Sequence, residues 1–107
     1  MGHRKDKRVV YQKIKEYLEV LEKSNIKLWK VYLYGSYAKN TYNNESDIDL
    51  AIFLDKDDLD GFDEDAQLMK LRRNVDIRIE PHPFAKSDFD ETNPYIKEII
   101  RTGDRII

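Results

Sequence analysis

Two short motifs, separated by ten residues, hold the side chains best suited to chemistry. Gly35 and Ser36 follow a short β-prone run, and Asp47 and Asp49 lie on either side of Ile48. A glycine lets the backbone approach a phosphate closely, and a serine at a helix start adds a hydroxyl where exposed N–H groups attract anions. Two neighbouring carboxylates on one strand face need a proton or a cation to neutralise them, and Mg²⁺ prefers such oxygen ligands. The pattern indicates phosphate binding beside a metal site.

A third carboxylate comes from a later segment of the chain. Residues 75–80 alternate apolar and charged side chains, which predicts a strand with Asp76 on its polar face. If this strand pairs beside the strand that carries Asp47 and Asp49, the three carboxylates converge. Such a cluster can clamp two metal ions about 3.5 to 4 Å apart and support in-line phosphoryl displacement.

Three basic residues near these motifs each have two interpretations. Lys39, just after the glycine turn, can reach a bound triphosphate or be an ordinary surface lysine. Arg78 shares the strand face of Asp76, where it either binds charge on the triphosphate or acceptor or forms an ion pair with Glu80 or another carboxylate. His82, between two prolines, can be a base or ligand, but a turn histidine without an evident partner is more often structural. Alone, each motif has a structural explanation, whereas their order along the chain favours a nucleotide site.

The hydrophobic pattern predicts the elements that must position these residues. We expect helices over residues 4–24, 66–73 and 94–101, a brief helix over 37–39, and strands over 31–34, 47–54 and 75–80. Residues 55–65 hold seven acidic side chains and are expected to form a solvated loop or the exposed start of a helix. Pro81 and Pro83 are expected to end the third strand. The fold class is α/β (α+β), with a small mixed sheet of about three to four strands flanked by helices.

Composition limits the kinds of function that are open to the chain. Its 107 residues predict one domain over residues 1–107. Nineteen basic and twenty-one acidic residues give a net charge of −2, so direct binding to nucleic acid is not expected without a local basic patch. The absence of cysteine excludes thiolate chemistry, and no signal peptide or membrane span is evident. We expect a soluble, cytoplasmic protein.

The segment GSYAKNTYNNESDIDLAIF resembles the GSx10DxD signature of the DNA polymerase β-like nucleotidyltransferase superfamily, and implies its fold. The small size, the VDIRI strand and the NPYIKEIIRTGDRII helix are similar to the minimal nucleotidyltransferases, or MNT proteins. The resemblance implies that Gly35 and Ser36 bind the triphosphate and that Asp47 and Asp49 ligate both metal ions. It also implies that Asp76 ligates the catalytic metal and helps to deprotonate the acceptor hydroxyl.

One residue departs from the family pattern, since Asn40 stands where relatives commonly have glycine. Asparagine tolerates a left-handed backbone better than most residues, so the turn can be kept.

The same resemblance suggests a reaction and a partner. MNT proteins often act as antitoxins of HEPN-domain toxins, which implies transfer of AMP from ATP, with two Mg²⁺ ions, to a hydroxyl of a HEPN-family RNase toxin, plausibly a tyrosine. A hetero-oligomer with that toxin is expected. Two alternatives stay open: an antitoxin that neutralises by binding alone, and transfer to a small molecule, as in the aminoglycoside nucleotidyltransferases. Those enzymes usually carry an additional helical domain for the acceptor.

Overall fold

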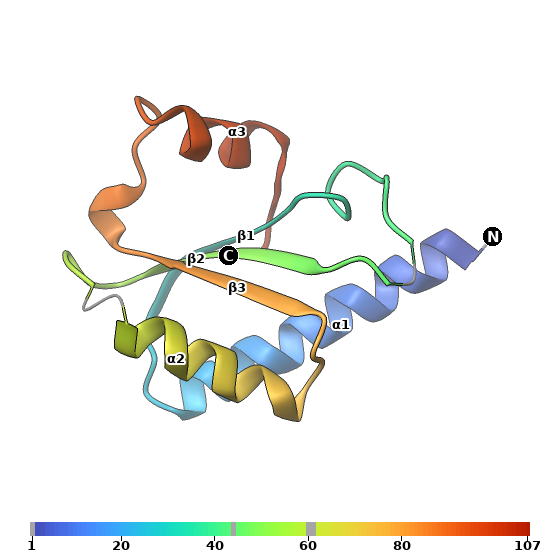
Figure 1. Ribbon diagram of the computed structural model, residues 1–107, viewed down its shortest axis with the longest axis horizontal. Coiled ribbons are helices and arrows are strands. Elements are labelled where there is room, and N and C mark those ends of the chain that lie inside the picture. The colour runs from blue at the N-terminus through green and yellow to red at the C-terminus, as the bar shows by residue number, and fades with distance from the viewer. Residues whose placement is uncertain (1, 44, 60–61) are drawn as a thin grey trace.

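A four-stranded sheet lies between two layers of helix (Figure 1). The structure, a computed structural model, describes residues 2–43, 45–59 and 62–107, and only the backbone of residues 2–6. The helices α1 and α2 cover one face of the sheet and α3 covers the other. In chain order the elements are α1 (Gly2–Lys23), β1 (Leu28–Tyr34), β2 (Ile48–Leu54), α2 (Phe62–Leu71), the 3₁₀ turn η1 (Arg72–Asn74), β3 (Ile79–Phe84), the 3₁₀ turn η2 (Lys86–Asp88), α3 (Pro94–Thr102) and β4 (Asp104–Arg105). This α+β arrangement confirms the fold class.

The strand order is β3-β2-β1-β4, which makes β2 a central strand and β3 an edge. The pair β1 and β2 is antiparallel, with Tyr34 opposite Asp49. The pair β2 and β3 is parallel, with Glu80 opposite Asp49. Tyr34, Asp49 and Glu80 therefore form one row across three strands.

Strand β2 is apolar because both of its faces are covered. Its alternate residues face the helices on opposite sides of the sheet. Asp49 is the single charged side chain in this strand. One face joins the core beneath α1 and α2 through Ile48, Leu50, Ile52 and Leu54. The other face joins a smaller core beneath α3 through Ala51 and Phe53. Asp49 lies on the α3 face, where the cover is incomplete.

The long first helix packs through the apolar stripe that its sequence predicts. The buried residues of the stripe are Val10, Ile14, Tyr17, Leu18 and Leu21. The buried hydroxyl of Tyr17 donates to the carbonyl oxygen of Leu68 at 2.8 Å, which ties α1 to α2. No helix in the described part of the chain is both long enough and apolar enough to cross a membrane.

The last helix begins and ends with recognisable signals. The side chain of Asn93 accepts a hydrogen bond from the backbone N–H of Tyr95 at 2.9 Å, and Pro94 takes the first helical position. Ile96 and Ile99 are buried against the sheet. At the other end, a Cβ on Gly103 would stand 2.5 Å from the carbonyl oxygen of Ile99, so only glycine fits without a shift.

The third strand is displaced from its predicted position. It covers Ile79–Phe84 instead of residues 75–80, because the backbone N–H groups of Val75 and Asp76 both bond to the carbonyl oxygen of Arg72 at 2.9 Å and continue the turn. The prediction that the prolines end the strand was wrong. The pairing of β2 with β3 begins with a hydrogen bond from the N–H of Ile48 to the carbonyl oxygen of Arg78. In this register the backbone nitrogens of Pro81 and Pro83 point away from β2. Because β3 is an edge strand, no partner strand needs a donor there.

Three smaller differences follow the same local logic. Residues 35–40 form consecutive turns instead of a brief helix. Helix α2 begins at Phe62, so the acidic residues 63–65 occupy its first turn, where negative charge suits the helix dipole; residues 60 and 61 of the acidic segment lie outside the described residues. The two-residue strand β4, which pairs with β1, was not predicted.

Candidate active site

The glycine turn and the aspartate strand meet at one atom. Gly35 has φ of +75°, a left-handed conformation that strains any other residue. The carboxylate of Asp49 lies directly over it, so that a Cβ at position 35 would overlap Asp49 Oδ2. Two backbone hydrogen bonds close the turn. The N–H of Lys39 donates to the carbonyl oxygen of Gly35 at 3.1 Å, and the N–H of Thr41 donates to the carbonyl oxygen of Ser36 at 2.9 Å. Asn40 has φ of +59°, as expected for a residue that replaces glycine.

Two of the three predicted carboxylates lie at the start of β2. Asp47 is exposed immediately before the strand, and Asp49 is partly exposed within it. Because alternate strand residues share a face, Asp49 belongs with Ala51 and Phe53 to the face that α3 covers. Glu80 stands beside Asp49 on the parallel strand β3 and is also partly exposed. Three carboxylates thus come from one end of the sheet, and the third is Glu80 instead of Asp76.

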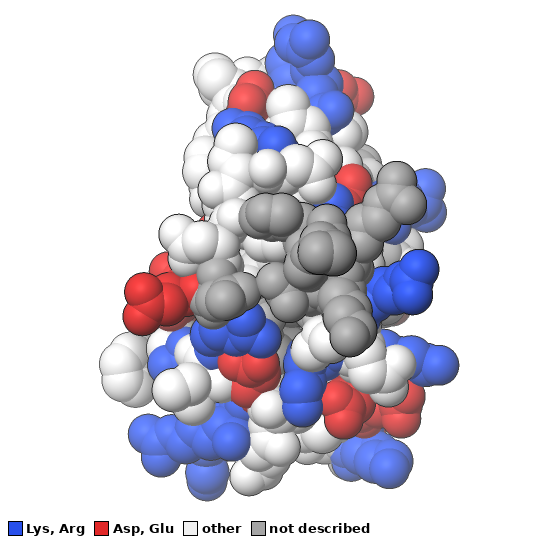
Figure 2. All heavy atoms as spheres, turned by 90° about the vertical axis from the view of Figure 1, so that its right-hand side faces the viewer, with Lys and Arg blue, Asp and Glu red and all other residues white. Residues whose placement is uncertain are grey.

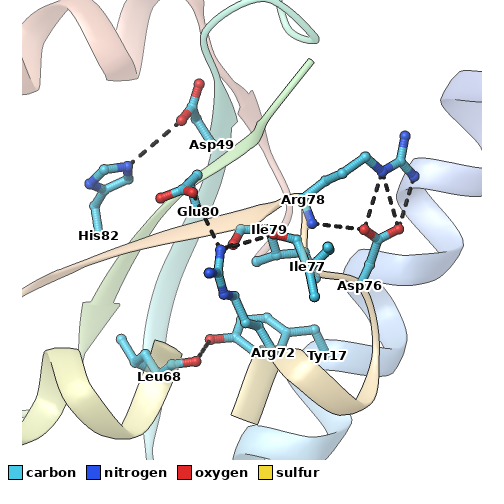
Figure 3. A network of polar contacts seen from close by, with 10 residues as sticks. All are labelled: Tyr17, Asp49, Leu68, Arg72, Asp76, Ile77, Arg78, Ile79, Glu80 and His82. Carbon is cyan, nitrogen blue, oxygen red and sulfur yellow. Dashed lines mark hydrogen bonds and ion pairs between the residues drawn. The ribbon is translucent and has the colours of Figure 1, made fainter. Parts of the chain in front are cut away.

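Glu80, the register partner of Asp49, was not among the carboxylates that the sequence predicted. Arg72 donates through Nη1 to the carbonyl oxygens of Ile77 at 2.9 Å and Ile79 at 2.8 Å, and lies 3.3 Å from Glu80 Oε1. This arginine fixes both the start of β3 and the position of the carboxylate (Figure 3). The alternation of the segment IEPHPF was the available signal, since an edge strand tolerates proline wherever its nitrogen faces outward.

His82 also belongs to the site and not to a turn. Its Nε2 is 3.7 Å from Asp49 Oδ1, and its side chain is 41% exposed. The interaction with Asp49 raises the pKa of His82, helped by the charges of Glu80 and Asp65 and opposed by burial. Asp49 therefore has a basic partner on one side and the glycine turn on the other.

Asp76 does not join the other carboxylates. It lies in the loop before β3, where its carboxylate accepts hydrogen bonds from Arg78 Nη2 at 2.9 Å, from Nε at 3.1 Å and from the backbone N–H at 2.8 Å. These bonds to Arg78 lower the pKa of Asp76. Figure 3 shows the pair at the N-terminal end of β3, apart from Asp49 and His82. The predicted convergence is absent because the strand starts after Asp76.

Arg78 instead contacts Tyr37, a residue of the glycine turn. Its Nη1 donates to the hydroxyl of Tyr37 at 3.3 Å, and that hydroxyl donates to the carbonyl of Asn43 at 3.4 Å. The buried ring of Tyr37 stacks on Tyr42 with centroids 4.4 Å apart. Of the two readings of Arg78, the structure shows the ion pair with a neighbouring carboxylate, Asp76.

Helix α3 forms one wall of the site. Lys39 Nζ is 3.8 Å from Glu98 Oε2, and the Tyr34 and Tyr95 hydroxyls are 3.0 Å apart. Both members of the Lys39–Glu98 pair are more than half exposed, so this ion pair is weak.

Figure 2 shows the face of the molecule that lies on the right-hand side of Figure 1. Among the described residues of this face, Lys and Arg are interspersed with Asp and Glu, so the face carries mixed charge.

The carboxylates suit a hard divalent cation in their chemistry. They are oxygen donors, and Asp49 and Glu80 come from adjacent strands, while the missing side chain of Gly35 makes room for the Asp49 carboxylate itself. As they stand, Asp49 is turned toward His82 and Glu80 toward Arg72. Accordingly, no three His, Asp or Glu side chains in the described part of the chain are gathered as a metal site.

Comparison with known proteins places this geometry in a family. No curated protein matches the sequence at a significant level. The family model described as polymerase beta, nucleotidyltransferase, matches residues 12–107, which include the glycine turn and all the carboxylates above. This match confirms the resemblance at the level of the superfamily. The chain therefore belongs to the polymerase β nucleotidyltransferase family.

Proposed function

We propose that this nucleotidyltransferase moves AMP from ATP to a hydroxyl of a HEPN-family RNase toxin, and so acts as that toxin's antitoxin. Nucleotidyl transfer follows from family membership. The observation that carries the proposal is the contact between Asp49 and Gly35, with Glu80 in register beside it. That contact joins a phosphate-binding turn to acidic ligands at one end of the sheet, which is the arrangement that phosphoryl transfer from a nucleoside triphosphate needs.

Each residue of the site has a distinct proposed role. The backbone of Gly35, the hydroxyl of Ser36 and the ammonium of Lys39 bind the triphosphate. Asp47, Asp49 and Glu80 would hold two Mg²⁺ ions, which supply charge neutralisation at the transferred phosphate.

The proton of the acceptor hydroxyl also needs a destination. We propose that it passes to the Glu80 carboxylate, the role that the sequence had given to Asp76. Asp76 has no proposed role in transfer; it pairs with Arg78, whose Nη1 donates to Tyr37 in the turn.

A protein acceptor suits the way the helices are used. In the described part of the chain all three helices pack on the sheet, so the face beside Asp49 is open to a group that another molecule presents. A tyrosine hydroxyl has an ordinary pKa near 10 and needs activation to attack at neutral pH. An added AMP would bring bulk and negative charge to a toxin that must approach RNA phosphates, which would inhibit it by occlusion and repulsion.

The test co-expresses the protein with a HEPN-domain protein, taken from the adjacent reading frame if that frame encodes one. With MgATP, the intact mass of the partner should rise by one or more AMP units, and its RNase activity should fall. The double variant Asp47→Asn with Asp49→Asn should lose the mass increase while remaining folded, since both side chains lie on a polar, partly exposed surface. Asp76→Asn is the matched control, because it removes a carboxylate outside the proposed site.

The competing function is neutralisation by binding alone. A partner that is inhibited without any gain in mass, in the wild type and in the double variant alike, would establish that function and refute the catalytic one.

A further inference from the structure

A pair of tyrosine hydroxyls lies next to the carboxylates. Tyr34 is the register partner of Asp49, and its ring centroid is 5.8 Å from that of His82. Its hydroxyl is 3.0 Å from that of Tyr95, in the first turn of α3. Tyr34 packs in the core beneath α3, the face to which Asp49 also belongs. A continuous series of contacts therefore leads from Asp49 through His82 and Tyr34 to Tyr95.

The two hydroxyls differ in what they can do. Burial, the hydrogen bond to Tyr95 and the charges of Asp49 and Glu80 all raise the pKa of Tyr34. The Tyr34 side chain is partly buried, and its hydroxyl is paired with that of Tyr95. Tyr95 is 51% exposed, and its ring rests against Tyr34 and Phe84 with centroids 6.4 and 6.3 Å away. Tyr95 is the hydroxyl that a substrate held at the carboxylates can reach.

We infer that Tyr95 is itself an acceptor, so that the protein transfers a nucleoside monophosphate to its own α3; this inference rests on the proposed function. Tyr95 Oη forms a bond to the α-phosphorus of the nucleoside triphosphate. The bond from that phosphorus to the bridging oxygen of the β-phosphate breaks, and pyrophosphate leaves. The hydroxyl proton passes to the Glu80 carboxylate, as for the other acceptor. The product is a phosphodiester between Tyr95 and the nucleoside, and no other reactant is required.

The modification would limit further transfer. A nucleotide on Tyr95 removes the hydrogen bond between the two hydroxyls and adds a negative charge and a base over the face that Asp49 and Glu80 occupy. The charge repels an incoming triphosphate, and the added bulk covers the approach of a second acceptor. A chain labelled at Tyr95 should therefore transfer more slowly than an unlabelled one.

The experiment incubates the purified full chain with Mg²⁺ and each of the four common nucleoside triphosphates, with and without the partner protein. Intact mass reports labelling, and peptide mapping locates it. Tyr95→Phe keeps the ring contacts and removes only the nucleophile. Tyr11→Phe is the matched control, since that hydroxyl donates to Asp104 and lies on α1, which covers the opposite face. Asp49→Asn tests whether the site itself catalyses the reaction, and circular dichroism checks that each variant is folded.

The expected result is one added nucleoside monophosphate on Tyr95 in the wild type and in Tyr11→Phe, with at least a tenfold loss in Tyr95→Phe and in Asp49→Asn. The same mass gain in Tyr95→Phe overturns the inference. A labelled partner beside an unlabelled chain also overturns it and leaves the proposed function standing. A chain labelled at Tyr95 beside an unlabelled partner supports the inference while the proposed protein target falls.

Discussion

The carboxylate of Asp49 lies so close to the Cα of Gly35 that a side chain at position 35 and Asp49 Oδ2 would occupy the same space. The two residues belong to different motifs, Gly35 in the turn after β1 and Asp49 in β2, and the contact brings these motifs together. Gly35 supplies a left-handed turn and also the gap into which the carboxylate fits. The two motifs, which are separated by ten residues in the sequence, therefore meet in space at this contact.

Gly35→Ala should therefore lose both stability and nucleotidyl-transfer activity. An alanine in the left-handed region costs about 1 to 2 kcal/mol, and its Cβ displaces Asp49. A displacement of about 1 Å at a reacting centre can reduce a rate on the order of a hundredfold. Urea unfolding measures the first effect, and nucleotidyl transfer per folded molecule measures the second.

Gly103→Ala is the control for that variant. Its Cβ would stand 2.5 Å from the carbonyl oxygen of Ile99 and 2.9 Å from that of Leu33, so it destabilises the end of α3 without touching Asp49. Equal losses of transfer per folded molecule in the two alanine variants would contradict a specific role for Gly35.

Glu80→Gln should abolish transfer, whereas Asp76→Asn should retain it. Glu80 is in register with Asp49, whereas Asp76 is bonded to Arg78 at the N-terminal end of β3. Loss of a carboxylate that holds a catalytic cation removes several kcal/mol of stabilisation, which is at least roughly a hundredfold in rate. Asp76→Asn should instead lower the free energy of unfolding by about 1 to 3 kcal/mol, as expected for a charged hydrogen bond.

Steady-state transfer and urea unfolding, measured on both variants, separate the two roles. A large loss of transfer in Asp76→Asn with full activity in Glu80→Gln would restore the assignment made from the sequence.

The difference between Asp76 and Glu80 shows how far the sequence can be read. Gly35, Asp47 and Asp49 are local signals, because a turn and a strand of alternating residues follow from neighbours in the chain. The start of β3 is not local: it depends on Arg72, which binds the carbonyl groups of Ile77 and Ile79. The spacing of residues in the sequence does not predict which carbonyl groups Arg72 binds.

His82 illustrates the same limit through sheet position. Two prolines around a histidine predict a turn when the strand is assumed to lie inside the sheet. Once β3 is the edge, their nitrogens face outward and the strand continues, which brings His82 to Asp49. The order of strands, which decides this point, is a property of the whole fold.

The pair of Asp76 and Arg78 predicts a specific pH dependence of stability. Arg78 lowers the pKa of Asp76 in the folded state below its ordinary value of 3.8. The stabilisation is therefore fully present above about pH 4 and is lost as the pH falls through the folded-state pKa. The difference in unfolding free energy between wild type and Asp76→Asn should be constant from pH 7 to 5 and shrink below pH 4.

Urea unfolding at pH 7, 5, 4 and 3 checks this expectation. Arg78→Lys is a useful companion, since a lysine cannot reproduce the bidentate contact and should show a smaller difference at neutral pH. A difference that persists undiminished at pH 3 would show that Asp76 stabilises the fold by something other than its charge.

The two prolines of β3 should protect the free edge of the sheet. The N–H of Ile48 bonds to the carbonyl of Arg78, and in a parallel ladder this register directs the nitrogens of Pro81 and Pro83 away from β2. A strand edge that lacks these donors is a poor template for another strand. Pro83→Val restores one outward N–H and raises β-propensity, so the variant should associate several-fold more than the wild type in light scattering at high concentration. His82→Val raises β-propensity on the same strand while its N–H stays paired to β2, and it should associate no more than the wild type. If His82→Val associates as strongly as Pro83→Val, then β-propensity, and not the missing donor, controls this edge.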